Sequence, residues 1–302
     1  MRLKHLLLNI IGFGLGSWLL YSGANGPAAA RSRKFSSGTV LLVCASVLLT
    51  LGRRGLSRDQ AAQKVAASVA ALCEPEYEYA SVKAEDFSHL DLAWYDASQQ
   101  WLEQNAYGLL GDEENLTFRR TSKGNRTLLR TMLSRDGTML AYLYHFKPSG
   151  LAAAGKDGFR ILEFQTHFAN GTFLGTSNAE AAGKLDSPPG VDALRLPSRT
   201  PLEAILTSHV QRVSAYLGNN PGVSAGRMAS LEDVHRVQNV LQQIKAVYRK
   251  NTGITKEELQ RLAGNRLCPE QIAALHADVQ QLHHQRNEDS ALCKSVVGTA
   301  QG

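Results

Sequence analysis

The sequence lacks the short motifs that mark the common enzyme chemistries. It has no phosphate-binding P-loop, no dinucleotide-binding glycine fingerprint, no nucleophile elbow and no HExxH zinc signature. It has only four cysteines, and none of them forms a CxxC pair. So sparse a set favours reduced thiols over a disulfide framework or a cysteine zinc site. We therefore expect no cofactor.

Low-complexity tracts are also missing. Of the 302 residues, 43% are hydrophobic and 20% are charged, which is the composition of a globular chain. This composition excludes a disordered chain, a collagen-like repeat and a disulfide-rich miniprotein. The length is sufficient for one large domain or two ordinary ones.

The net charge of +6 favours a nucleic-acid partner only until its distribution is considered. The first 64 residues hold nine of the 33 basic residues and one acidic residue. The remaining 238 residues hold 24 basic and 26 acidic residues, a net charge of −2. The body of the protein is therefore acidic, which argues against nucleic acid as a partner.

Two uncharged, apolar segments separate these N-terminal basic residues. Residues 6–30 and 35–52 contain no charged side chain, and Arg or Lys lies near every end. Because about 17–25 apolar residues span a bilayer, we predict a membrane anchor over residues 1–54, as a transmembrane helix or a helical hairpin. A pair of buried helices in a soluble core is the alternative, but it does not explain the flanking charges. The first segment also fits a cleaved signal peptide that ends in Ala28-Ala29-Ala30.

The basic residues also predict the orientation of the anchor. With the N-terminus inside, two spans place six basic residues on the cytoplasmic side and three outside. If the first segment is cleaved, the second becomes a stop-transfer helix, and the body again ends inside. Both alternatives predict a cytoplasmic body and a lipid bilayer as a partner.

The body begins with helical patterns and continues with strand patterns. A capping box at Ser57 opens a helix to about Leu72, an acidic linker follows, and a second helix spans about residues 90–107. Alternating patterns then predict five strands: Leu116–Thr121, Thr127–Leu133, Thr138–Phe146, Phe159–Phe168 and Thr172–Thr176.

Asp136-Gly137 and Asn170-Gly171 are typical hairpin turns between these strands. If Asp136-Gly137 is a two-residue loop, it fixes the register of the two strands that it joins. One face of this hairpin is then apolar and aromatic. Leu133, Thr131 and Leu129 then face Leu140, Tyr142 and Tyr144.

Four further helices are predicted after the strands. Three cover about residues 200–217, 230–250 and 269–286, and a short one begins at the cap Thr255–Glu258 (TKEE). The fold class is therefore α+β, with an antiparallel β-meander of about five strands flanked by helices and a helical C-terminal part. The predicted boundaries are 1–54 for the anchor, 55–89 for a helix and acidic linker, 90–218 for the sheet domain, 219–287 for the helical part and 288–302 for a flexible tail.

The best candidate site lies on the predicted sheet. Glu163, Gln165 and His167 alternate along one face of a strand, and His145 lies on a neighbouring strand. If these faces coincide, Glu163, His145 and His167 could bind a metal ion or act as an acid–base pair. The alternative is an ordinary, partly solvated sheet face.

Two other polar clusters have a structural and a functional interpretation. His276, His283 and His284 on the last helix are either metal ligands or residues that flank a packing seam. The densest basic cluster of the body either contacts acidic headgroups or is simply solvated. It consists of Arg119, Arg120, Lys123, Arg126 and Arg130.

Four stretches resemble an uncharacterised group of bacterial proteins that combine similar sheets with variable membrane segments. They are Gly108–Asp112 (GLLGD), Leu128–Gly137 (LLRTMLSRDG), Tyr142–His145 (YLYH) and Phe164–Asn178 (FQTHFANGTFLGTSN). The resemblance covers about residues 90–215 and implies a bacterial inner membrane as the setting. It implies no catalytic residue, cofactor or partner.

Together these patterns predict a membrane-anchored protein whose body is a non-catalytic binding or protein-interaction module. Its partner is another protein, or a small apolar ligand held against the aromatic sheet face. The alternative function is a membrane-associated enzyme with Glu163, His145 and His167 at its centre.

Overall fold

The computed structural model describes residues 57–71, 73, 76–121, 126–147, 158–180 and 184–299. The chain divides into two compact units. The sheet unit is Pro75–Ile244, and the helical unit consists of two segments, Met1–Glu74 and Lys245–Gly302. The two predicted membrane segments lie outside the described residues. Within the described ranges, no helix has the length and apolar character needed to cross a bilayer.

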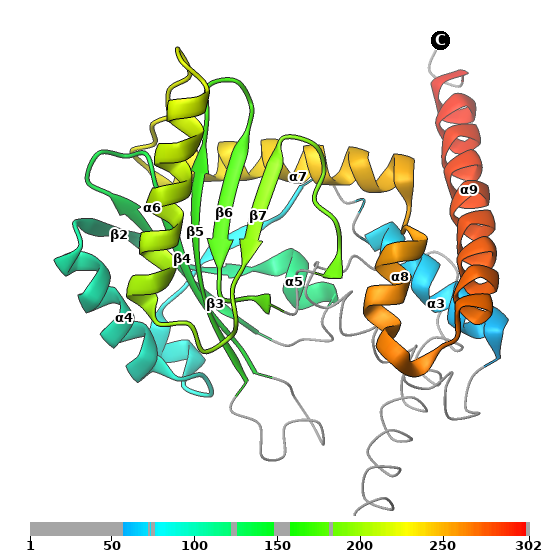
Figure 1. Cartoon of the computed structure of the whole chain (residues 1–302), viewed down its shortest axis with the longest axis horizontal. Helices are drawn as coiled ribbons and strands as arrows, with labels where there is room; N and C mark the ends of the chain where they lie inside the picture. The colour runs from blue at the N-terminus through cyan, green and yellow to red at the C-terminus, as the bar shows by residue number, and fades with distance from the viewer. Residues whose placement is uncertain are drawn as a thin grey trace, which may run out of the picture. The chain divides into compact units, whose positions relative to one another are not determined.

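The sheet unit is α+β, as predicted, but its sheet has seven strands in chain order rather than five (Figure 1). Neighbouring strands are antiparallel except for the last two, which are parallel. The strands are β1 (Tyr79–Ser81), β2 (Tyr107–Asn115), β3 (Leu128–Ser134), β4 (Leu140–Phe146), β5 (Phe159–His167), β6 (Phe173–Ser177) and β7 (Val191–Arg195).

The strand prediction was wrong where composition and local period are poor guides. Leu116–Thr121, predicted as a strand, is helix α5, because six residues are too few to separate the two periods. β2 was missed because its glycines and carboxylates have low β-propensity. β1 and β7 are short edge strands whose pairing depends on distant residues.

The predicted register between β3 and β4 is confirmed. Leu129 pairs with Tyr144, Thr131 with Tyr142, and Leu133 with Leu140. At the turn the Gly137 N–H donates to the Ser134 carbonyl at 2.8 Å, and Gly137 has a φ of +77°. The Asp-Gly dipeptide therefore does supply the left-handed residue that this turn requires.

Replacing Gly137 by alanine should destabilise the sheet unit. A left-handed backbone alone costs alanine about 1–2 kcal/mol, and we expect a larger loss. A Cβ atom at this position would lie 2.5 Å from the Met228 carbonyl oxygen. Gly171→Ala is the matched control, because Gly171 also has a positive φ but no atom within 4 Å of the added Cβ. Urea denaturation compares the two, and equal losses would contradict the proposed contact.

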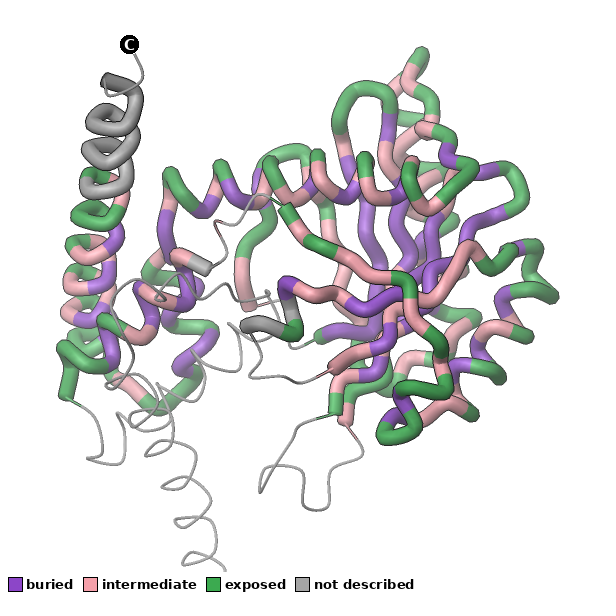
Figure 2. The backbone as a smooth tube through the Cα atoms, turned by 180° about the vertical axis from the view of Figure 1, so that it is seen from behind, coloured by how far each residue is buried: buried purple, intermediate pink, exposed green. Residues whose placement is uncertain are grey.

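One face of the sheet, here called the core face, forms the apolar core of the unit. Helices α4 (Leu92–Gln104) and α6 (Leu202–Asn219) cover it, together with the short helix η2 (Ala84–Phe87). Tyr95 and Leu102 of α4 and Ile205 of α6 are completely buried against strand residues. Figure 2 shows the buried positions concentrated in the strands.

The opposite face, here called the α7 face, is the aromatic face predicted from the hairpin. Met228 and two valines of helix α7 (Leu231–Thr252), Val234 and Val237, pack on Leu133, Leu140 and Tyr142. Figure 1 shows α6 in front of the strands and α7 behind them. The first half of α7, predicted to belong to a helical part over 219–287, is therefore built into the sheet unit.

The helical unit contains α3 (Arg58–Ala71), α8 (Lys256–Ala263), the short helix η5 (Gly264–Arg266) and α9 (Pro269–Thr299). The predicted capping box at Ser57 is present, and the predicted cap at Thr255 is a capping box as well. Arg58 of α3 pairs with Asp278 of α9 at 2.7 Å. α9 runs to Thr299, beyond its predicted end at Arg286.

Polar side chains of α9 complete the end of α7. His283 Nε2 and Asn287 Nδ2 lie 2.9 and 3.0 Å from the Lys250 carbonyl oxygen. Gln280 Nε2 donates to the Ile254 carbonyl at 2.8 Å, and His276 Nε2 lies 3.1 Å from the same oxygen. His276 and His283 therefore serve the packing of α9, as one of the two predictions for them stated.

Candidate functional site

The structure does not bring the three predicted site residues together. Glu163 pairs across the strands with Tyr142 and His167 with Phe173, so both side chains lie on the α7 face. His145 pairs with Arg160 and has the opposite parity, so it lies on the core face. Four residues of strand, about 13 Å, separate Glu163 from His167.

His145 is buried and connects strand β4 to the beginning of helix α4. Its Nδ1 accepts the Asp91 N–H at 3.1 Å, and its backbone N–H donates to the Tyr95 hydroxyl at 2.6 Å. Asp91 in turn caps α4, because its carboxylate accepts the Trp94 N–H at 3.1 Å. These bonds give His145 a structural role at the N-terminus of α4.

His167 is packed against backbone rather than against another titratable group. A Cβ atom on Gly226 would lie 1.9 Å from His167 Nε2, so the glycine is required for the close approach. Its Nδ1 is buried without a hydrogen-bond partner among the described residues. Burial lowers the pKa of His167, which favours the neutral ring.

Glu163 belongs to a line of polar residues that runs across five strands of the α7 face. Each member pairs directly with the next: Thr131, Tyr142, Glu163, Ser177 and Arg195. This set, here called the polar row, was not found from the sequence. Its last member lies on β7, which was not predicted, and the row exists only in this strand order.

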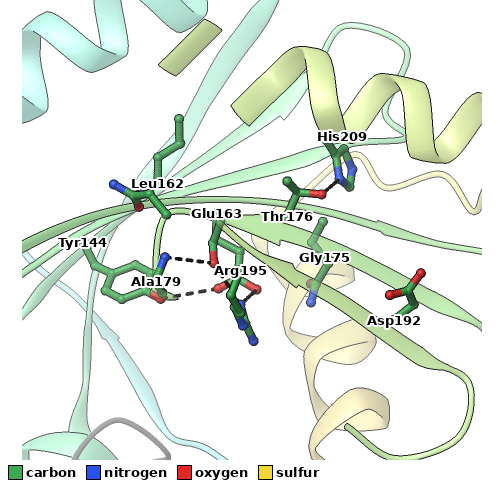
Figure 3. Close-up of polar contacts among 12 residues, drawn as sticks. Tyr144, Leu162, Glu163, Gly175, Thr176, Ala179, Asp192, Arg195 and His209 are labelled. Carbon is green, nitrogen blue, oxygen red and sulfur yellow. Dashed lines mark hydrogen bonds and ion pairs between the residues drawn. The ribbon is translucent and has the colours of Figure 1, made fainter. Parts of the chain in front are cut away.

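The β5–β7 end of the polar row is a partly exposed ion pair (Figure 3). Arg195 Nη1 lies 3.5 Å from Glu163 Oε1 and donates to Ser177 Oγ at 2.9 Å. The Tyr144 hydroxyl donates to Glu163 Oε2 at 3.4 Å, and burial raises the pKa of Tyr144. About a fifth of each charged side chain is exposed, 20% for Glu163 and 22% for Arg195. The arrangement can hold a charge pair at the surface.

The rest of the α7 face carries polar contacts between α7 and the strands. His235 Nε2 of α7 lies 2.8 Å from the buried Glu113 carboxylate. The Tyr79 ring stacks on His235 with centroids 5.0 Å apart. Gln238 of α7 donates to the side chain of Gln165. None of these groups was selected from the sequence except Gln165.

A buried histidine on the core face was also missed. His209 of α6 places its two ring nitrogens 3.0 Å from the hydroxyls of Thr166 and Thr176 (Figure 3 shows the Thr176 bond). Burial lowers the pKa of His209 to about 3, and the nearby Arg212 adds to this shift. Arg212 itself bonds the Gly175 carbonyl of β6 and pairs with Asp192 of β7 at 2.8 Å. No sequence motif marks His209, which is one of several polar residues in an amphipathic helix.

Three of the five residues in the predicted basic cluster pair with carboxylates of the same chain. Arg130 is buried against Asp112 at 2.8 Å and Asp96 at 3.1 Å. Arg126 and Arg119 both pair with Glu114, at 2.9 and 3.6 Å. These three arginines stabilise β2 and β3 and form no open basic patch. β2 therefore takes a strand conformation despite its acidic composition.

Several polar side chains on each face of the sheet thus bind one another. In the described part of the chain, no group of three or more His, Cys, Asp or Glu residues has the arrangement of a metal site. Comparison of the chain with protein-family models, with curated proteins and with solved structures gives no match.

Proposed function

We propose that this protein is a membrane-anchored, non-catalytic module that binds another protein. The observation that supports it best is the separation of the candidate catalytic groups. Glu163 and His145 lie on opposite faces of the sheet, and each is held by bonds to its own chain. Acid–base or metal chemistry requires such groups within hydrogen-bond reach of one position.

A protein partner is favoured over a small apolar ligand because of α7. The aromatic face was the expected wall of a ligand cavity. Val234 and Val237 pack on this face, and Leu140 and Tyr142 are only 1% and 8% exposed. Nucleic acid is disfavoured because the body is net acidic and because Arg119, Arg126 and Arg130 are already paired.

The anchor is proposed from the apolar segments 6–30 and 35–52 with their flanking basic residues. A bacterial inner membrane with the body in the cytoplasm is the proposed setting. Protease treatment of spheroplasts that carry a C-terminal tag tests the orientation, and we expect the tag to survive until the cells are lysed. Digestion from outside would contradict the cytoplasmic assignment, and a shorter mature chain would reveal cleavage of the first segment.

The binding function is tested by proximity labelling in the native host, with a labelling enzyme fused to the full chain. The matched control is the same enzyme on residues 1–54 alone. We expect the full chain to enrich a reproducible partner, and Glu163→Gln and His167→Gln chains to enrich it equally. These two variants remove the titratable groups of the alternative, enzymatic function. They should also restore the phenotype of a deletion strain to at least about half of the wild-type level.

Failure of both variants to restore the phenotype, while they still fold, would favour the membrane-associated enzyme. Absence of any enrichment over the anchor control would contradict the binding module. His145 is not used in this test, because its replacement disturbs the beginning of α4 and would impair folding.

A further inference from the structure

The helices that cover the two faces of the sheet make different kinds of contact with it. On the core face, α4 and α6 contribute a continuous apolar cluster that includes Tyr95, Leu102, Phe164 and Ile205. On the α7 face the apolar contacts are few, and polar side chains lie among them. Polar groups in a packed interface weaken it unless each finds a partner.

Several buried polar atoms of the α7 face and of α7 itself form no hydrogen bond in the described part of the chain, among them Thr131 Oγ1, His167 Nδ1 and Asn239 Oδ1. Thr131 is completely buried in the polar row, and its hydroxyl makes no hydrogen bond. The amide oxygen of Asn239 on α7 is likewise buried and unpaired. An unpaired buried polar atom costs free energy in the closed state, and that cost disappears when the interface opens to water.

A buried carboxylate adds to this cost. The Glu113 side chain is 4% exposed and pairs with His235, which is itself 34% exposed. A further polar contact is the amide pair of Gln165 and Gln238. Each of these polar bonds can be replaced by bonds to water, so α7 is held on the sheet by its apolar side chains, among them Val234, Val237 and Leu231, which contacts Gly111 of β2.

Helix α7 carries its own start signals and can remain helical away from the sheet. The Asp233 N–H donates to Ser230 Oγ at 3.2 Å, and the Asp233 carboxylate accepts the Ala229 N–H at 3.0 Å. Arg236 pairs with Asp233 at 3.1 Å and with Glu232 at 3.6 Å. The residue before this cap, Met228, is held by a backbone bond to Gly137 at 2.9 Å, so the pivot lies between Met228 and Leu231.

We infer that the first half of α7, Leu231–Ile244, is a displaceable cover of the α7 face. It leaves the sheet as an intact helix in the native state, and the core face stays packed beneath α4 and α6. The opening exposes Leu140, Tyr142 and the buried part of the polar row. Local openings of this kind have free energies well below that of global unfolding.

The test compares two cysteines on the same strand. Leu140 on the α7 face is 1% exposed, and Leu143 on the core face is 0% exposed, both on β4. Leu140→Cys and Leu143→Cys are made separately in the full chain with its four native cysteines changed to serine. Labelling by a thiol reagent under native conditions should be about 100-fold faster at position 140, because only that position is reached by local opening.

Thr131→Val links this opening to the unpaired hydroxyl. Valine fills the same volume without the polar atom, so the closed state should become more stable relative to the open state. Labelling at position 140 should slow by about fivefold, and labelling at position 143 should not change. If Leu143→Cys fails to fold, Leu162→Cys replaces it, since Leu162 is also fully buried on the core face.

Equal labelling rates at the two positions would overturn the inference, because both would then report global unfolding. A rate at position 140 that Thr131→Val leaves unchanged would overturn the proposed cause of the opening.

Discussion

Replacing Glu258 by glutamine should destabilise the helical unit by about 3–5 kcal/mol. Glu258 Oε1 and Oε2 lie 2.6 and 2.8 Å from the two terminal nitrogens of Arg249. The two side chains are 0% and 7% exposed, so the substitution removes a counter-charge that lies against a buried guanidinium. It also disturbs the capping box of α8, in which the Glu258 carboxylate accepts the Thr255 N–H at 2.8 Å. Amide hydrogen exchange of α8, measured at a series of urea concentrations, gives the loss in the free energy of unfolding.

The adjacent residue supplies the control. Glu257 is exposed, so Glu257→Gln removes the same charge without uncovering a buried partner. The double replacement Arg249→Met with Glu258→Leu should recover most of the stability, because it removes both buried charges together. A loss at position 258 within about 1 kcal/mol of the loss at position 257 would mean that the pair contributes little.

The stability of the sheet unit should fall steeply below pH 6.5 because of His209. Its folded-state pKa is about 3 against an ordinary value of 6.5, so between these values the unfolded chain binds the additional proton. The stabilisation is fully present above pH 6.5 and decreases by about 1.4 kcal/mol for each pH unit below it. The loss should reach about 3 kcal/mol at pH 4.

Substitution isolates this contribution from those of other titrating groups. His209→Gln should be less stable at pH 7, because it retains at most one of the bonds to Thr166 and Thr176. Its stability should then depend less on pH, so the two curves converge toward pH 4. Urea denaturation followed by the fluorescence of Trp94 and Trp101 on α4 measures both chains. The control, His89→Gln at an exposed histidine, removes an imidazole elsewhere. Parallel curves for wild type and His209→Gln would contradict the assignment.

Local signals predicted much of the fold. The capping boxes at Ser57 and Thr255 and the register of the β3–β4 hairpin depend on residues within a few positions of one another. Such signals can be read without knowledge of the tertiary structure. β2 and β7 could not be predicted in this way. β2 depends on arginines that neutralise its carboxylates, and β7 depends on Arg212 of a later helix.

The candidate site was harder to predict because it depends on the parity of strands β4 and β5. The sequence indicates that Glu163 and His167 share a face, and both do lie on the α7 face. It does not indicate how β4 pairs with β5, because no short turn connects them. A shift of one residue moves every side chain of a strand to the other face of the sheet. The observed register places His145 on the core face and Glu163 on the α7 face. The polar row required the full strand order.

The bonds between α9 and the end of α7 also have a consequence for the order of synthesis. A helix leaves its last carbonyls without partners, and here the donors for Lys250 and Ile254 are encoded 22 to 37 residues later. During translation the last turn of α7 therefore emerges long before the side chains that complete it. A chain that stops before Gln280 retains the whole of α7 but loses Gln280, His283 and Asn287, and with them three of the side chains that contact these two carbonyls.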